Sequence, residues 1–171
     1  NKFGNHNVSG MLLWNIDQYD NNAPGNLVAS LPRRKMGFAG RLSYDYDNRY
    51  MFEVNAGYNG SENFAKGHKW GFFPSVAVGW NVSQENFFEP LKDVISNLKL
   101  RASYGLVGND QLLDSSGGLI RFIYMSDITL QSENAGFTTG DKQQITLNGP
   151  VYTRYQNNDL TWEVGEKLNV G

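Results

Sequence analysis

The sequence contains no cysteine and only two histidines, His6 and His68. A disulfide framework and a thiolate metal site are therefore excluded. No second histidine or carboxylate stands at metal-ligand spacing from His68, so we expect neither a metal nor another cofactor. Aspartate and glutamate outnumber lysine and arginine, which gives a formal net charge of −2. Because nucleic-acid-binding domains normally carry a basic stripe, this balance speaks against that class.

The sequence also lacks the usual marks of an enzyme and of a helical membrane protein. No apolar run approaches the roughly 20 residues that a membrane-spanning helix needs. Glu85, Glu89 and Asp93 lie close together in the chain, but a solvated turn explains them better than a general acid–base pair. The Ser-Gly-Gly-Leu run at 116–119 is not followed by Gly-Lys-Ser/Thr, so it predicts a turn rather than a phosphate loop. We therefore expect no catalytic residues.

What the sequence does have is alternation between large apolar and polar or small residues. The pattern runs from Gly37 to Tyr46 and, after a short Asp-Asn connection, from Tyr50 to Tyr58. It recurs at 74–82 and 98–106, and more weakly at 6–16 and 160–170. Since successive side chains of a strand point to opposite faces, these segments predict about six strands of roughly ten residues in an all-β fold. One helical turn is expected over Glu89–Ser96.

The two predicted faces differ in composition. One face carries charged and amide residues such as Arg41, Glu53 and Asn55, whereas the other places small aliphatic residues between aromatic ones. Aromatic girdles around an aliphatic band are typical of transmembrane β-barrels, in which the polar face looks into the lumen. The aromatic residues in question are Trp14, Tyr44, Tyr46, Tyr50, Tyr58, Trp80, Tyr104 and Trp162. The alternative is a soluble all-β carbohydrate-binding module, with these aromatics as its core.

The connections between the strands alternate in length, as those of an up-and-down antiparallel barrel do. The longest, at about 107–158, falls on the side expected for extracellular loops, so an epitope tag at Ser116 should be reachable on intact cells. Six strands cannot close a barrel, because bacterial outer-membrane barrels begin at about eight. Open edges in lipid would leave backbone groups unpaired. We therefore expect residues 1–171 to be an incomplete part of a larger transmembrane barrel.

Three stretches carry a family resemblance. They are GRLSYDYDNRYMFEVNAGYNGSENFAKGHKWGFFPSVAVGWNVSQENFF, ISNLKLRASYGLVGND and NDLTWEVGEKLNVG. In these stretches the chain resembles the SusC/RagA-type TonB-linked outer-membrane transporters, from about Leu31 to Gly171. The resemblance implies a segment from the C-terminal half of a barrel of about 22 strands, without the plug domain.

The resemblance also implies a function and a set of partners. Such a transporter sits in the outer membrane of Gram-negative bacteria and imports nutrients, namely glycans or peptides. Its partners would be outer-membrane lipid, the remaining barrel and plug of the parent protein, TonB acting through the missing N-terminal part, and a SusD-like surface lipoprotein.

The long connection at about 107–158 is the segment most suggestive of ligand binding. Aromatic side chains among amides and carboxylates suit sugars or peptides, because they combine apolar area with orienting hydrogen bonds. The alternative, which we favour for any single residue, is that these residues pack on neighbouring loops or on the lipoprotein. Leu119–Ser126 is expected to form a strand of a hairpin. The candidate ligand-binding residues are Asn109, Asp110, Phe122, Tyr124, Phe137, Tyr152 and Tyr155.

Overall fold

A computed structural model describes residues 2–23, 30–113, 115, 117–142 and 145–171. The chain divides into two compact units. The first comprises Asn1–Ser61, Trp70–Asp110 and Trp162–Gly171, and the second comprises Glu62–Lys69 and Gln111–Thr161. Antiparallel strands dominate both units, which confirms the predicted all-β class.

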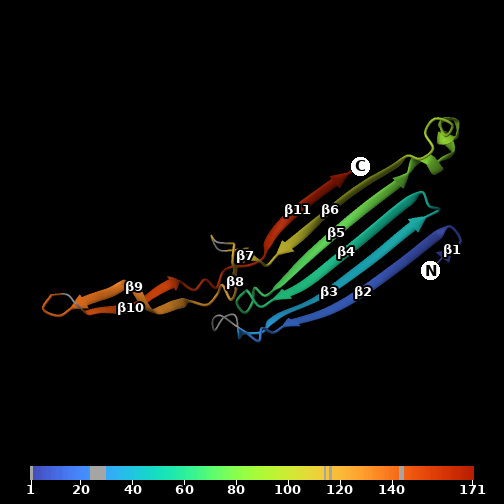
Figure 1. Cartoon of the computed structure of the whole chain (residues 1–171). Helices are drawn as coiled ribbons and strands as arrows, with labels where there is room; N and C mark the ends of the chain where they lie inside the picture. The colour runs from blue at the N-terminus through green and yellow to red at the C-terminus, as the bar shows by residue number, and fades with distance from the viewer. Residues whose placement is uncertain (1, 24–29, 114, 116, 143–144) are drawn as a thin grey trace. The chain divides into compact units, whose positions relative to one another are not determined.

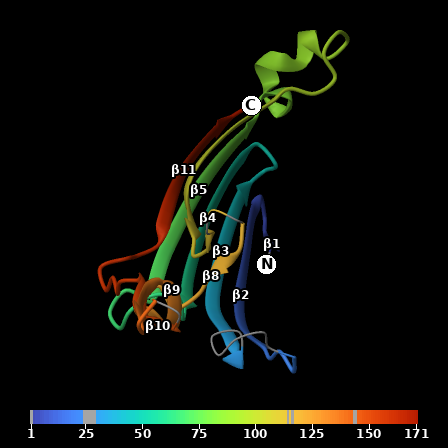
Figure 2. The same ribbon diagram turned by 60° about the vertical axis from the view of Figure 1, so that its left-hand side comes forward.

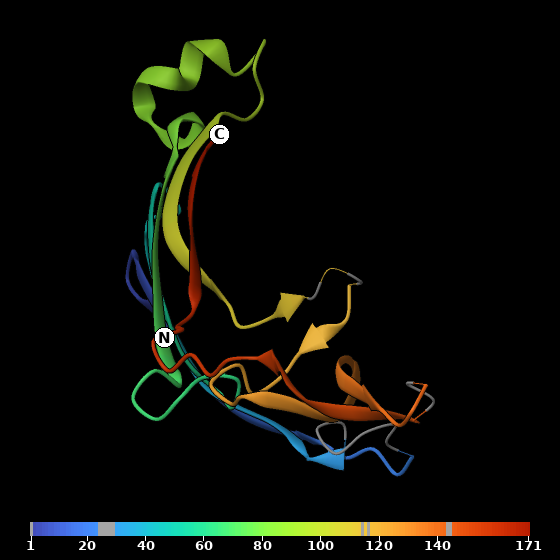
Figure 3. The same ribbon diagram turned by 90° about the vertical axis from the view of Figure 1, so that its left-hand side faces the viewer.

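The first unit is one open, antiparallel sheet in which the strands lie side by side almost in chain order (Figure 1). Figure 3 shows this sheet nearly edge-on as a bowed layer. Its six longer strands overlap the six segments predicted from the alternation, with bounds that differ by up to four residues. The strands, in spatial order, are β1 (Lys2–Phe3), β2 (His6–Tyr19), β3 (Arg33–Tyr46), β4 (Tyr50–Ser61), β5 (Trp70–Asn81), β6 (Lys99–Asn109) and β11 (Glu163–Val170).

The register of the sheet confirms the predicted division into two faces. Residues paired directly across antiparallel strands point to the same side of the sheet. One such row consists of Gly10, Leu42, Val54, Val76, Tyr104 and Leu168. The next row, on the other face, consists of Met11, Arg41, Asn55, Ser75, Gly105 and Lys167. Apolar and polar rows thus alternate across the whole width of the sheet.

The apolar face of the sheet is not a protein core. Leu12 is 83% exposed and Val78 is 50% exposed, although both lie within long, well-paired strands. Among the residues that the structure describes, the buried hydrophobic ones are Phe64, Ala65, Val82, Phe88, Phe122 and Ile123, all outside the strands. A soluble sandwich would bury its aromatic face against a second sheet. The exposed face therefore favours the barrel over the soluble module.

One end of the sheet carries the tight β3–β4 turn and the longer β5–β6 link (Figures 1 and 2). Between β3 and β4, Asp47 and Asn48 both have positive φ, of 53° and 54°, and Arg49 N–H donates to the Tyr46 carbonyl at 2.9 Å. This is a type I′ turn, which Asp and Asn tolerate better than most residues.

The β5–β6 link forms two 3₁₀ helices, η1 (Val82–Gln84) and η2 (Asn86–Leu91). The helical turn predicted at Glu89–Ser96 is only partly confirmed. Helix η2 begins three residues earlier, at Asn86, and ends at Leu91. Within the described ranges, no helix is long and apolar enough to cross a membrane.

The second unit contains a short strand pair and a longer hairpin. Strands β7 (Leu112–Leu113) and β8 (Leu119–Ile120) pair with each other, and β9 (Asp127–Thr139) pairs with β10 (Ile145–Arg154) with several register shifts. The strand predicted at Leu119–Ser126 is largely wrong, since it ends at Ile120. Phe122 has a positive φ of 49° and begins a turn, and Phe122 and Ile123 are both buried, which strand alternation would not allow.

Candidate functional site

The polar face of the sheet carries a hydrogen-bonded charge network in the middle of β3 and β4. Arg41 Nε donates to Asn55 Oδ1 at 2.8 Å, and Asn55 Nδ2 donates to Glu53 Oε1 at 2.8 Å. Ser43 Oγ donates to the other Glu53 oxygen at 3.1 Å, and Arg41 lies 3.6 Å from Glu53. Such a network would be costly in lipid but is suited to water. This face has the chemistry of a barrel lumen.

The apolar face is bounded by two rows of aromatic side chains. The first row is His6, Tyr46, Tyr50 and Trp80, and the second is Trp14, Phe38, Tyr58 and Phe72. Trp14 stacks on Phe38 at 6.1 Å, and Tyr58 stacks on Trp70 at 4.7 Å. On β4 the rows are separated by the span from Tyr50 to Tyr58, roughly 27 Å along a strand. For a strand tilted by about 40°, the height is about 20 Å, close to the apolar band of an outer-membrane barrel.

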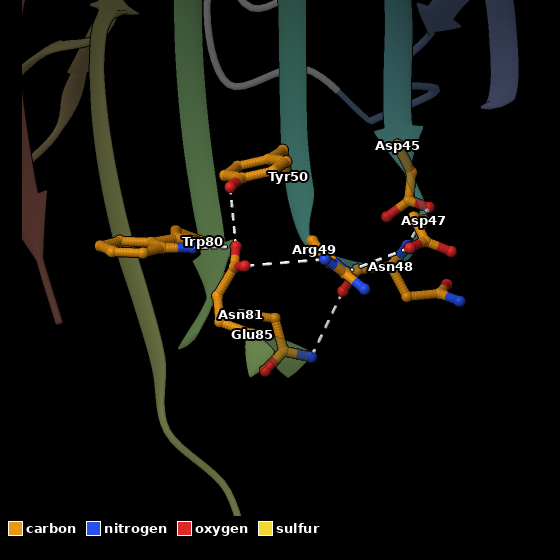
Figure 4. Close-up of polar contacts among 8 residues, drawn as sticks. All are labelled: Asp45, Asp47, Asn48, Arg49, Tyr50, Trp80, Asn81 and Glu85. Atoms are coloured by element: carbon orange, nitrogen blue, oxygen red, sulfur yellow. Dashed lines mark hydrogen bonds and ion pairs between the residues drawn. The ribbon is translucent and has the colours of Figure 1, made fainter. Parts of the chain in front are cut away.

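At the end of the sheet with the short turns, one carboxylate organises the β5–β6 link. Figure 4 shows Tyr50, Trp80 and Arg49 converging on Glu85. The Tyr50 hydroxyl donates to Glu85 Oε1 at 2.7 Å, Trp80 Nε1 donates to the same oxygen at 3.2 Å, and Arg49 lies 3.6 Å from Oε2. The hydrogen bonds from Tyr50 and Trp80, followed by the charge of Arg49, hold the pKa of Glu85 below its usual value. The link is thereby fastened to the first aromatic row.

At the opposite end of the sheet, Asp110 joins strands that are not neighbours. Its carboxylate accepts from Lys35 Nζ at 2.9 Å and from Ser61 Oγ at 2.8 Å, so the end of β6 is tied to β3 and β4 across β5. Burial opposes ionisation of Asp110, but Lys35 and Ser61 together outweigh it, and the pKa of the carboxyl is lowered. The stability that the ionised Asp110 contributes to the folded state is complete at neutral pH. It is lost as the pH falls from the ordinary carboxyl pKa of 3.8 through the lower pKa of the folded state.

We expect Asp110→Asn, made in the full-length receptor, to loosen the start of the long connection. The amide keeps the shape but loses the charge that pairs with Lys35, which is partly exposed, so the cost is about 1 kcal/mol. Limited proteolysis should then cut after β6 about fivefold faster at neutral pH. Asp141→Asn, in the turn of the β9–β10 hairpin, is the matched control. Equal cleavage of the two variants would contradict the role given to Asp110.

The seven candidate ligand-binding residues are divided between the two units. Asn109 and Asp110 belong to the first unit, where Asn109 Nδ2 donates to Glu163 at 2.9 Å. The other five belong to the second unit. Their part in ligand binding stays a prediction.

Two aromatic pairs form among these five residues of the second unit. Phe122 is buried and meets Tyr124 edge-on at 6.3 Å, which fits a packing role for Phe122. Tyr152 and Tyr155 stack at 5.2 Å and are 54% and 76% exposed. Phe137 is exposed and pairs across the hairpin with Leu147. The stacked tyrosines are the pair best suited to contact a ligand.

The sequence pattern missed an aromatic cluster on the polar face. Phe73 lies in the row of Leu13, Ala39 and Gly57, and its ring meets Trp162 edge-on at 5.2 Å. Trp162 was predicted to lie on the apolar face. It precedes β11, and its ring instead packs against Phe73, which belongs to a row of the polar face. The glycines at 71 and 108 are the signal for this cluster, since a Cβ at either would strike the Phe73 ring.

Among the described residues, no group of three or more histidine and carboxylate side chains could hold a metal ion. Lys2, Asp45 and Asp47 line a small depression near the β3–β4 turn, together with Gly4, Asn5, Asn7 and Asn48. In the turn itself, Asp45 Oδ1 accepts from Asn48 N–H at 3.1 Å and Asp47 pairs with Arg49 at 3.1 Å. These polar groups therefore stabilise the turn.

Several curated proteins are similar to this chain. It is 35% identical over 132 residues to TonB-dependent receptor P3 of Formosa agariphila, a match that covers 77% of this chain and 12% of that protein. It is 33% identical over 136 residues to TonB-dependent receptor SusC of Bacteroides thetaiotaomicron, covering 80% of this chain and 12% of the relative. The chain thus spans about an eighth of the length of these relatives. No family model matches it.

Among solved structures, the chain is similar to that of the RagAB peptide importer in the "closed-closed" state. The TM-score is 0.68 at 16% identity, over 99% of this chain and 20% of that one. A second structure, of the RagAB peptide transporter, gives a TM-score of 0.64 at 17% identity. These likenesses concern the fold alone, and they place the open sheet among the strands of a large membrane barrel.

The fold and its two faces define part of a Gram-negative outer-membrane β-barrel. More particularly, the chain is a segment of a SusC-type TonB-dependent receptor, which confirms the resemblance carried by its sequence motifs. The names of these relatives are those of receptors and not of enzymes.

Proposed function

We propose that this chain forms part of the wall of a TonB-dependent importer that takes up glycans or peptides across the outer membrane. The apolar face contacts lipid and the polar face lines the lumen. The observation that carries this proposal is the alternation of mainly apolar and mainly polar rows across β2, β3, β4, β5, β6 and β11. The proposed coupling to TonB is supported by the names of the relatives, which are TonB-dependent receptors.

The remaining parts of the importer follow from the same proposal. The outer edges of β2 and β11, unpaired along most of their length within the described structure, pair with other strands of the parent barrel. The plug domain and the segment that contacts TonB lie elsewhere in the parent protein. A SusD-like lipoprotein covers the end of the barrel that carries the long connection, and Tyr152 and Tyr155 contact the glycan or peptide.

The facing is tested by single-cysteine labelling in the full-length receptor. Val54 and Asn55 are neighbours on β4 and point to opposite faces. We expect Val54→Cys, labelled with a fluorophore and reconstituted into vesicles, to be quenched by lipid-soluble quenchers and protected from aqueous ones. Asn55→Cys should behave in the opposite way. A stronger lipid-phase signal at Asn55 would reverse the assignment of both faces.

The orientation is tested by an epitope tag. Ser116 lies outside the described residues, so the tag is better placed after Gly140, in the exposed turn between β9 and β10. Because the long connection is proposed to be extracellular, antibody should label intact cells as strongly as permeabilised ones. A matched tag at Asn48, in the β3–β4 turn, should be labelled only after permeabilisation. Labelling of the Asn48 tag alone on intact cells would invert the orientation.

A further inference from the structure

The β5–β6 link carries apolar side chains that neither face of the sheet explains. Phe87 is 63% exposed and Val94 is 85% exposed, and Leu91 and Ile95 are exposed beside them in the chain. Two other side chains of the link, those of Val82 in η1 and Phe88 in η2, are buried and anchor it. We call the exposed side chains of Phe87, Leu91, Val94 and Ile95 the link patch.

Backbone hydrogen bonds fix the conformation that presents the link patch. Phe88 N–H donates to the Glu85 carbonyl at 3.1 Å, and the N–H groups of Val94 and Ile95 donate to the Leu91 carbonyl at 3.1 and 2.8 Å. The charged neighbours Glu89 and Lys92 pair with each other at 2.9 Å. The segment therefore exposes apolar side chains, and its charged residues Glu89 and Lys92 are paired with each other.

The link patch meets the apolar face of the sheet at Phe87. The Phe87 ring lies 6.5 Å from the ring of Trp80, which belongs to the first aromatic row. Glu85 holds this end of the link against the same row by accepting from both Tyr50 and Trp80. The exposed apolar residues of the link thus begin where the apolar band of the strands ends.

We propose that the link patch is a membrane-contacting surface that lies in the boundary between headgroups and acyl chains, beside the first aromatic row. Its occupant is phospholipid of the leaflet nearest the short turns. Short amphipathic segments bind there by burying apolar side chains a few ångströms deep, and aromatic side chains favour the same level. This inference rests on the proposed lipid-facing role of the apolar face.

The test uses the full-length receptor with single cysteines at Val94, Glu89, Val54 or Asn55, each carrying an environment-sensitive fluorophore. The protein is reconstituted into phosphatidylcholine vesicles whose chains carry bromine either near the headgroup or near the terminal methyl group. We expect the label at Val94→Cys to be quenched roughly twofold more by the shallow bromine than by the deep one. The label at Val54→Cys should favour the deep bromine, and the label at Glu89→Cys should be quenched less than that at Val94→Cys.

Each outcome separates the inference from the proposed function. Quenching at Val54 without quenching at Val94 would leave the barrel wall intact and overturn the link patch, which would then face water or a protein partner. Absence of lipid quenching at Val54, with quenching at Asn55, would overturn the facing of the sheet and the inference with it. Shallow quenching at Val94 together with deep quenching at Val54 is the result that the inference requires.

Discussion

Val54→Arg in the full-length receptor should lower the folded yield in the outer membrane sharply and shift the denaturant midpoint to lower concentration. Val54 lies in the middle row between the two aromatic rows, at the depth expected for the centre of the apolar band. Arginine on the lipid face near the bilayer midplane costs about 2–4 kcal/mol in a transmembrane barrel. The measurement is unfolding in vesicles followed by the change of gel mobility on heating, with the folded yield from membrane fractions.

The matched control for this substitution is Asn55→Arg, one residue further along β4 on the polar face. Asn55 already accepts a hydrogen bond from Arg41, and a second arginine there would stand in water near Glu53. We expect its effect to be small by comparison. Equal losses for the two variants would mean that β4 does not separate lipid from lumen, and the proposed barrel wall would be wrong.

Gly108→Ala should clearly destabilise the sheet. A Cβ at this position would overlap the ring of Phe73, which also covers Gly71 and meets Trp162. Overpacking of this kind costs about 1–3 kcal/mol because the ring cannot move away without losing its other contacts. The midpoint of unfolding in vesicles should fall accordingly. Gly40→Ala, where nothing lies within 4 Å of the new methyl group, is the matched control.

A second variant distinguishes this steric cause from a general intolerance of β6. Phe73→Ala removes the ring that the new methyl group would strike, so the double variant should be less destabilised than the sum of the two single ones. We expect a coupling of about 1–2 kcal/mol in this cycle. Strictly additive effects would show that Gly108 is required for another reason, such as backbone conformation.

The strands and their facing could be predicted from the sequence because both depend on local information. Tyr44, Phe52 and Val78 each alternate with polar or small neighbours, and a period of two is a property of the strand itself. The order of the strands agrees with the tendency of consecutive strands to lie beside each other, although among the six longer strands only β3 and β4 are joined by a tight turn. The type of the Asp47–Asn48 turn is consistent with the same local rules.

The tertiary structure decided whatever depends on contacts between residues distant in the chain. The alternation marks Trp162 as apolar, but its contact with Phe73 depends on where the chain enters β11. Asp110 was a candidate ligand-binding residue of the long connection. In the structure it is buried, and its carboxylate accepts hydrogen bonds from Lys35 and Ser61, which lie 75 and 49 positions earlier in the chain. Such contacts arise only once the register has brought β3, β4 and β6 to one end of the sheet.

The long connection shows the same limit most clearly. Its sequence has mixed polar and aromatic residues without a steady period, so neither the bounds of β9 and β10 nor their register shifts could be read from it. The stacking of Tyr152 on Tyr155 depends on the course of the chain after β10. The position of the exposed Phe87 beside the apolar face is seen only from its ring contact with Trp80. Alternation determines which side of a strand is apolar, whereas the packing of irregular segments depends on the surfaces that the completed sheet offers them.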